Sequence, residues 1–439
     1  MKRALLTLCV SALGLLGVSI ASPASSLAAS PAAQSSAPAS SPPPEPVIQW
    51  NQFLLGIQAT AGDQPATVHA TYELAIMHAA IYDAVVSIDH SGTPYRTTVH
   101  GPRQASVAAA ADSAAHDTLV QLYPSLRSSI DQEYAGLLAQ VPAGRHKSQG
   151  VRVGQAVAKQ LLTQRARDGS GATPPPFQPG SNPGDYQLTP PAFAQPVFTH
   201  WPMVTPFVLR HANQFRPQPP PALTSSKYAA AINEVQALGA GQGSTRTPDQ
   251  TQIGMFWNPP IWATWNRIAE TAAIGHHGTL SADAHTFAVL NLTFADSVIA
   301  FYDAKYTYRL WRPVTAIRNA DADGNPDTTQ DPIWSPLSAT APDPSYPGAH
   351  GTISAAGAAV LSSVYGNDFT FAVTSPALPN VERDFSSFSE AAEEASVSRV
   401  YNGNHTRIDQ VAGENLGRDV AGFVLTDGQL ARSAGRHHR

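Results

Sequence analysis

Apolar residues at helical spacing are the feature of this 439-residue chain that most restricts its fold. From Trp50 onward they recur at the i, i+3, i+4 spacing of a helix, whereas the alternation typical of strands is scarce. The segments with this spacing are Trp50 to Ile57, Leu74 to Val85, Ala105 to Leu122, Ile130 to Leu138, Gln149 to Arg167, Tyr228 to Leu238, Trp262 to Ile274, Ala282 to Tyr308, Thr352 to Val364, Ser389 to Val400 and Arg407 to Leu425. Such stripes must be buried against one another, so we predict an all-α fold of helical bundles in two packed halves.

Overall composition narrows the classes of protein that fit. The chain is 43% hydrophobic and 13% charged, which is typical of a globular protein and not of a disordered or fibrous one. Its formal net charge is -5 and it has no long basic run, which argues against nucleic acid as a partner. Any site for an anion must therefore be local.

The N-terminus has the layout of a secretory signal peptide. Met1-Lys2-Arg3 precedes an apolar run, residues 4–20, and small residues follow up to Ala29. We predict a signal peptide over 1–28 and a secreted or extracytoplasmic protein, with an uncleaved N-terminal anchor as the alternative. No second run of membrane length was found, so no membrane span is expected after cleavage. The one cysteine, Cys9, lies in this segment, which excludes thiol catalysis in the mature protein.

Changes in composition along the chain predict its domain organisation. Residues 29–46 are rich in Ala, Ser and Pro and are expected to form a linker. The glycine-rich break at 239–244 divides an N-terminal helical half, 47–240, from a C-terminal helical half, 241–428, and a flexible tail covers 429–439. The Pro-rich connection 172–221 is expected to be a surface wrap or a binding loop.

Three short motifs in the C-terminal half carry the chemistry. In the first, Lys305, Arg309 and Arg312 have i, i+4, i+7 spacing, which would put them on one helical face before Pro313 ends or kinks the helix. Arginine donates two parallel hydrogen bonds and lysine adds a point charge, so this face would suit a tetrahedral oxyanion such as phosphate or vanadate. Alone, however, such a stripe is typical of a solvated face.

In the second motif, residues 346–349 form a turn and His350 stands where a helix of small residues begins. A helix N-terminus presents unpaired N–H groups and a partial positive charge, so the turn would cradle an anion. Taken alone, the motif is also typical of a glycine turn before a packed helix.

The third motif repeats this arrangement. Ser398-Arg399 closes a helix, Asn402-Gly403 predicts a turn, and Thr406 with Asp409 resembles a capping box. His405 lies just before that helix and is either a surface histidine or a second residue facing an anion. Two helix starts that each bear a histidine, together with a cationic helix, favour a functional site.

Lys-x6-Arg-Pro, Pro-x-x-His and Ser-Arg-x5-His together resemble the signature of vanadium-dependent haloperoxidases and of the related type 2 phosphatidic acid phosphatases. The spacings match from Lys305 to Arg312 and from Ser398 to His405. Segments 50–54, 77–84 and 302–306 look like the secreted bacterial haloperoxidase-like branch, and the resemblance covers most of residues 47–428. It implies the fold of two packed helical halves that these enzymes have.

The resemblance implies a role for each motif residue. His405 would bind vanadium, and the oxyanion would be held by Lys305, Arg312, Arg399 and the backbone N–H of Ala349. His350 would handle protons and Lys305 would polarise the peroxide, so that hydrogen peroxide oxidises a halide, which then reacts with an organic acceptor.

The same motif residues also fit two other functions. In a secreted acid phosphatase, which needs no cofactor, the same His405 would attack the phosphorus of a phosphomonoester and form a phosphohistidine, while His350 would protonate the leaving alcohol. A phosphate-binding or structural relative without catalysis is the third possibility.

The second motif departs from the pattern of the family, which reads Pro-Ser-Gly-His. This chain has Pro347-Gly348-Ala349-His350, so the serine hydroxyl that donates to the oxyanion is missing. One lost hydrogen bond to an anion weakens binding by about 1.5–3 kcal/mol. Ser345 and Thr352 are the two nearby hydroxyls that could replace it.

Overall fold

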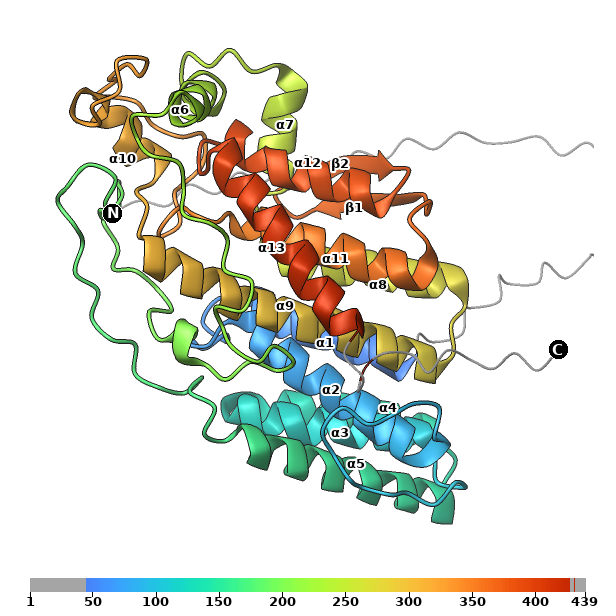
Figure 1. The fold of residues 1–439 in the computed structure, drawn as a ribbon. Helices are drawn as coiled ribbons and strands as arrows, with labels where there is room; N and C mark the ends of the chain where they lie inside the picture. The colour runs from blue at the N-terminus through green and yellow to red at the C-terminus, as the bar shows by residue number, and fades with distance from the viewer. Residues whose placement is uncertain (1–44, 427–429, 431–439) are drawn as a thin grey trace, which may run out of the picture. The chain divides into compact units, whose positions relative to one another are not determined.

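Thirteen α-helices and one two-stranded sheet form the regular structure of the residues that this computed structural model describes, 45–426 and 430 (Figure 1). The helices are α1 (Pro46–Ala59), α2 (Ala70–Asp89), α3 (Val107–Leu122), α4 (Arg127–Gln140), α5 (Arg145–Arg165), α6 (Ser226–Gly239), α7 (Pro248–Phe256), α8 (Ile261–His276), α9 (Leu280–Tyr308), α10 (Pro313–Arg318), α11 (Ala349–Tyr365), α12 (Phe388–Tyr401) and α13 (Arg407–Thr426). The all-α prediction is confirmed, and every predicted helical segment overlaps a helix.

The elements that the sequence prediction lacked are short ones. α7 has 9 residues and α10 has 6, too few to show a helical period, although Thr247 and Gln250 form a capping box at the start of α7. The antiparallel hairpin of β1 (Phe371–Ser375) and β2 (Leu378–Phe385) pairs Phe371 with Phe385 between α11 and α12. It is the one sheet among the described residues.

Some predictions concern residues whose structure is not described. The signal peptide over 1–28 and almost all of the linker over 29–46 lie outside the described residues, as does the tail over 429–439 except for Leu430. The described residues belong to one compact unit, and a boundary between two halves near Gly239 stays a prediction.

α9 is the central helix of this unit. It packs against α2 on one side and against α11 and α13 on the other, as Figure 1 shows. By length and composition α9 alone among the described helices could cross a membrane, but 94% of its apolar window is buried inside the protein. Burial on all sides is typical of a core helix, and it explains why α9 is apolar all round.

α11 and α13 approach each other closely because glycines face the contact. A β-carbon at Gly417 would lie 2.1 Å from the backbone oxygen of Thr352, and one at Gly413 would lie 2.3 Å from that of Gly348. Both distances are far shorter than real contacts, so only glycine permits this spacing. The contact brings the start of α13 against the turn that precedes α11, and both carry motif residues.

The Pro-rich connection, residues 172–221, is hydrogen-bonded to α9. The carboxylate of Asp296 on α9 accepts from the backbone N–H groups of Phe207, Val208 and Leu209 at 2.6, 2.7 and 2.7 Å. A buried carboxylate with three backbone donors holds a loop that has no ladder of its own. Residues 207–209 of this connection therefore pack against α9, as the prediction of a surface wrap expects.

Candidate functional site

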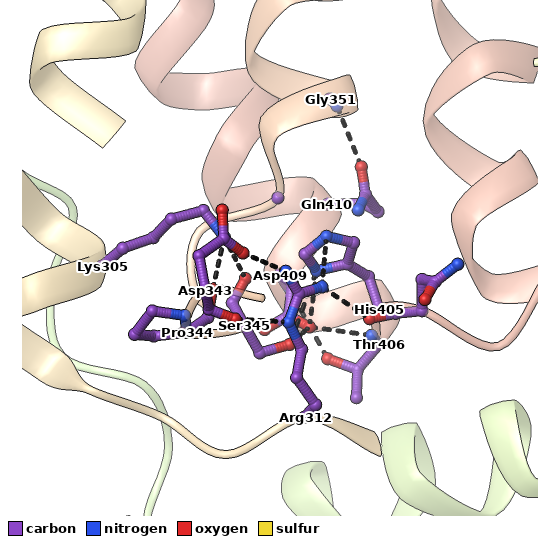
Figure 2. A network of polar contacts seen from close by, with 12 residues as sticks. Lys305, Arg312, Asp343, Pro344, Ser345, Gly351, His405, Thr406, Asp409 and Gln410 are labelled. Atoms are coloured by element: carbon purple, nitrogen blue, oxygen red, sulfur yellow. Dashed lines mark hydrogen bonds and ion pairs between the residues drawn. The ribbon is translucent and has the colours of Figure 1, made fainter. Parts of the chain in front are cut away.

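Lys305 and Arg312 form the centre of a buried group of charges at the C-terminal end of α9 (Figure 2). The Nζ of Lys305 donates to the backbone oxygens of Pro344 and of Ser345, the latter at 3.3 Å. Arg312 precedes the first turn of α10, and its Nε donates to the backbone oxygen of Asp343 at 2.7 Å. Both cations also contact the Asp343 carboxylate, Lys305 at 3.4 Å and Arg312 more closely. Residues 343–345 therefore hold the two cations together.

The predicted helical face of Lys305, Arg309 and Arg312 is wrong. Arg309 has a left-handed backbone with φ 50, which ends α9, and Pro313 begins a new helix at a position where its missing N–H costs nothing. The guanidinium of Arg309 lies over the ring of Phe177. Lys305 thus reaches the site from the last turn of α9 and Arg312 from the residue just before α10, and Arg309 is not part of the site.

Asp343 is a site residue that the sequence prediction missed. It is buried, and its carboxylate lies between two cations. Burial would raise the pKa of Asp343, but the charges of Lys305 and Arg312 outweigh this effect and lower that pKa. The residue lies in a connection without periodicity. Its one signal in the sequence is its place between Pro342 and Pro344, just ahead of the second motif.

The ring of His405 is held from both sides. Arg312 donates to its Nε2 at 3.0 Å, and its Nδ1 lies 3.4 Å both from the hydroxyl of Ser345 and from the Oδ2 of Asp409. Because arginine can only donate, Nε2 accepts, and the ring proton therefore belongs on Nδ1, where the Ser345 hydroxyl can accept it beside the Asp409 carboxylate. Burial and then the charges of the three cations lower the pKa of His405 well below its usual range. His405 is thus a neutral imidazole whose Nε2 electron pair faces the cations and accepts from Arg312.

Asp409 fixes this orientation and also starts α13. Its Oδ2 accepts from the backbone N–H of Thr406 and from the hydroxyl of Ser345, each at 2.8 Å. Its own N–H donates to the Thr406 hydroxyl at 3.3 Å. The predicted capping pair of Thr406 and Asp409 is confirmed, and it places His405 directly ahead of the helix.

Arg399 joins α12 to the His405 loop. Its backbone oxygen accepts from the N–H groups of Asn404 and His405 at 3.0 and 3.2 Å. Its guanidinium donates to Asn258 at 3.1 Å, while its buried Nε has no hydrogen-bond partner within the described residues. Burial and then the charge of Arg312 lower the pKa of Arg399. Because the buried Nε of Arg399 lacks an acceptor within the described residues, this cation is suited to donate to a bound anion.

The start of α11 supplies the second histidine. Ala349 is the first residue of this helix, where N–H groups have no acceptor within the helix. His350 follows it and is partly exposed, and its Nε2 lies 3.0 Å from the backbone oxygen of Trp257, to which only a protonated nitrogen can donate. Burial and then the charges of Arg399 and His405 lower the pKa of His350 well below its usual range.

The three motifs meet in one group. Arg312 contacts His405 directly and shares Asp343 with Lys305. Arg399 and His405 lie near enough to act electrostatically on His350. We call this group the cation cluster, and its members are Lys305, Arg312, Asp343, His350, Arg399 and His405.

The cation cluster fits a tetrahedral oxyanion. Two buried donors, the Nε of Arg399 and the Nε2 of Gln410, have no partner within the described residues, and such donors are costly unless a ligand accepts from them. No group of three or more His, Cys, Asp or Glu side chains in the described residues could hold a bare metal ion. An oxyanion such as vanadate needs cations and a single ring nitrogen instead, which are the groups found here.

Sequence comparison relates the chain to vanadium-containing peroxidases. The family model of the VCPO second helical-bundle domain matches residues 285–431, the segment with all three motifs. The vanadium chloroperoxidase of Curvularia inaequalis is 28% identical over 173 residues, which are 31% of this chain. The match spans only 27% of that protein's length.

Structural comparison extends the similarity over nearly the whole chain. The crystal structure of the first bacterial vanadium-dependent iodoperoxidase superposes with a TM-score of 0.73 at 26% identity and covers 87% of this chain and 94% of its own. The holo form of a bacterial vanadium-dependent chloroperoxidase gives a TM-score of 0.65 over 85% of this chain and 96% of its own. At 15% identity the latter shows a shared fold alone.

Proposed function

Because this chain belongs to the superfamily of vanadium-dependent haloperoxidases and type 2 phosphatidic acid phosphatases, we propose that it is a haloperoxidase-like enzyme that oxidises halide with hydrogen peroxide at the cation cluster. The relative that supports this best is the bacterial iodoperoxidase, which matches almost end to end.

The orientation of His405 carries the proposal. Its Nε2 accepts from Arg312 and therefore carries an electron pair, while the opposite nitrogen, Nδ1, carries the proton and faces the hydroxyl of Ser345 and the carboxylate of Asp409. This is the state in which imidazole binds a metal, and a carboxylate behind the ring raises its basicity as a ligand.

Vanadate would be held by the Nε2 of His405 and by Lys305, Arg312 and Arg399, with the backbone N–H of Ala349 as a further donor. When bound, it supplies activation of hydrogen peroxide for the oxidation of a halide. The side chains themselves neutralise the negative charge and keep the oxyanion in one orientation, because Lys305 and Arg312 are fixed by residues 343–345.

His350 would move the protons. Its Nε2 faces the backbone oxygen of Trp257, so its Nδ1 is the free acceptor, and its lowered pKa keeps the ring neutral before substrate arrives. Negative charge brought to the cluster would offset the cations and raise that pKa. The ring could then take a proton from hydrogen peroxide and give it to the oxygen that leaves as water. The partly exposed side chain links the buried cations to solvent.

The test is halide oxidation by protein freed of bound anions. Purified protein receives vanadate, hydrogen peroxide and iodide, bromide or chloride in turn, and oxidised halide is followed by absorbance. We expect activity that depends on vanadate and falls by at least about 100-fold in His405→Ala. Unchanged activity in that variant would contradict the assignment of the site.

Hydrolysis of p-nitrophenyl phosphate, measured in parallel, separates the phosphatase alternative. A protein without vanadate-dependent halide oxidation, whose phosphate ester hydrolysis is inhibited by vanadate, would be a phosphatase of the same superfamily. A protein that binds phosphate and performs neither reaction would be a relative without catalysis.

We also propose that the protein is exported and loses residues 1–28, for which the charged start and apolar run of the N-terminus are the support. Mass spectrometry of protein from the medium or periplasm of an expressing bacterium should give a mature chain that begins near Ala29. A chain that stays in the cytoplasm and begins at Met1 would contradict export.

A further inference from the structure

The space beside Gly348 is filled by the side chain of Gln410. A β-carbon built on Gly348 would lie 2.3 Å from the Nε2 and 2.7 Å from the Cδ of Gln410. Real β-carbons essentially never come so close to a neighbouring atom. Any side chain at 348 would therefore require the end of the Gln410 side chain to move out of this space.

The orientation of the Gln410 amide is determined by a backbone donor. The N–H of Gly351 can only donate, and it lies 2.9 Å from the amide oxygen of Gln410. In Figure 2 this oxygen is turned toward Gly351, while the side chain lies on the same side of the site as His405. The amide nitrogen, Nε2, must then point away from Gly351.

That amide nitrogen is a donor without an acceptor. Only 2% of Gln410 is exposed, and its Nε2 has no hydrogen-bond partner within the described residues. Since the Nε2 lies where a side chain of Gly348 would be, it stands beside the N-terminus of α11 and one residue from Ala349. Buried polar groups in folded proteins are almost always paired, so this donor indicates a ligand.

The two hydroxyls that the sequence offers as donors are both occupied. Ser345 donates to the carboxylate of Asp409 at 2.8 Å, and Thr352 donates to the backbone oxygen of Gly348 at 2.9 Å. Neither is free for an anion. Gln410 is the side chain left near this turn with a free donor.

We propose that the Nε2 of Gln410 donates a hydrogen bond to the bound oxyanion and fills the place that a side chain at Gly348 would otherwise take. The inference rests on the proposed function, because it needs an oxyanion in the cation cluster. In this proposal Gly348 and Gln410 are a coupled pair. Gly348 leaves space for the Gln410 side chain, and Gln410 supplies the hydrogen-bond donor.

The test measures anion binding and not only activity. Isothermal titration calorimetry gives dissociation constants of anion-free protein for vanadate and, separately, for inorganic phosphate. We expect Gln410→Ala to bind both anions roughly 10- to 100-fold more weakly, the effect of one hydrogen bond to a charged acceptor. Gln410→Glu keeps the size and the acceptor for Gly351 but replaces the donor, so it should bind at least as weakly.

A double variant at positions 348 and 410 tests the coupling of the two residues more directly than either single variant. Gly348→Ser combined with Gln410→Ala vacates the space and returns a hydroxyl donor, and it should recover to within about threefold of the wild-type constant. Gly348→Ser alone should bind weakly, because its side chain collides with Gln410. Ser396→Ala is the matched control, since the Ser396 hydroxyl donates to Glu414 at 2.6 Å and reaches the oxygen of the Gln410 amide, at 3.4 Å, but not its nitrogen. It should change binding by less than about threefold.

The outcomes separate the two proposals. Wild-type affinity in Gln410→Ala and Gln410→Glu would overturn the inference while the proposed function stands. A double variant no better than Gln410→Ala would overturn the coupling of the pair. If the wild-type protein binds neither anion, the proposed function fails first and this inference with it. Circular dichroism and the urea midpoint identify any variant that is merely misfolded.

Discussion

Two single residues outside the motifs, Asp343 and Gln410, contribute a negative charge and a hydrogen-bond donor to the site. Asp343 places a negative charge between Lys305 and Arg312, which keeps two buried cations together when no anion is present. The same carboxylate competes with an oxyanion for those cations. Neither residue could be predicted from the sequence, because one lies in a connection and the other depends on contact between α11 and α13.

Asp343→Asn should tighten anion binding. The substitution keeps the shape of the side chain and removes its charge, so the dissociation constant for phosphate should fall by roughly tenfold. Calorimetry provides the measurement. Asp83→Asn is the control, since Asp83 is buried on α2 and accepts from backbone N–H groups of residues 95–97. Weaker phosphate binding in Asp343→Asn would contradict the idea that Asp343 competes with the anion.

Lys305 should give anion binding a pH dependence. Burial lowers its pKa to about 8, although Asp343 opposes this effect. Below that pH Lys305 is charged and attracts an anion, and above it the charge is lost. Sulfate keeps its own charge over this range, so its dissociation constant should rise by up to roughly tenfold per pH unit above about 8.

Lys305→Met supplies the comparison for this titration. It should bind sulfate weakly at all pH values and lack the rise near pH 8. A wild-type affinity that stays constant from neutral pH to about pH 9.5 would show that Lys305 is not the titrating group.

At the scale of elements, most of the fold could be predicted and the helix ends could not. Apolar spacing located α9, α11, α12 and α13, because a period of 3.6 residues survives in any helix of several turns. Arg309 has a left-handed backbone that ends α9, although the helical spacing of Lys305, Arg309 and Arg312 had predicted one continuous helix. The motif spacing was therefore right about which residues meet and wrong about how Lys305 and Arg312 are brought together.

Close packing of α11 against α13 should depend on Gly417. Gly417→Ala pushes a methyl group toward the backbone of α11 and should lower the free energy of unfolding by about 1–3 kcal/mol. Gly422→Ala on the same helix is the control, because nothing lies within 4 Å of its β-carbon. That variant should instead be stabilised by about 0.5–1 kcal/mol. Urea unfolding measures both, and equal effects would contradict the packing argument.

For the whole molecule, the cation cluster acts as a cross-link between segments far apart in the chain. Residues 305–312, 343–350 and 399–410 meet there, and the first of these segments contains the end of the central helix α9. An anion bound by all three segments should stabilise the folded chain as one unit, since the unfolded chain has no such site.

Vanadate at 100 times its dissociation constant should therefore raise the free energy of unfolding by about 2.7 kcal/mol. The gain should disappear at the same concentration in His405→Ala. Chemical unfolding followed by tryptophan fluorescence provides the measurement, with sodium chloride of equal ionic strength as the control. Equal stabilisation of the variant would place the anion elsewhere.

A crystal structure of the protein with vanadate is the most direct test of the account. It should show one oxyanion with vanadium bonded to the Nε2 of His405 and its oxygens within hydrogen-bond distance of Lys305, Arg312, Arg399 and the Nε2 of Gln410. Vanadate bound away from His405, or an empty cation cluster at a concentration that supports halide oxidation, would contradict it.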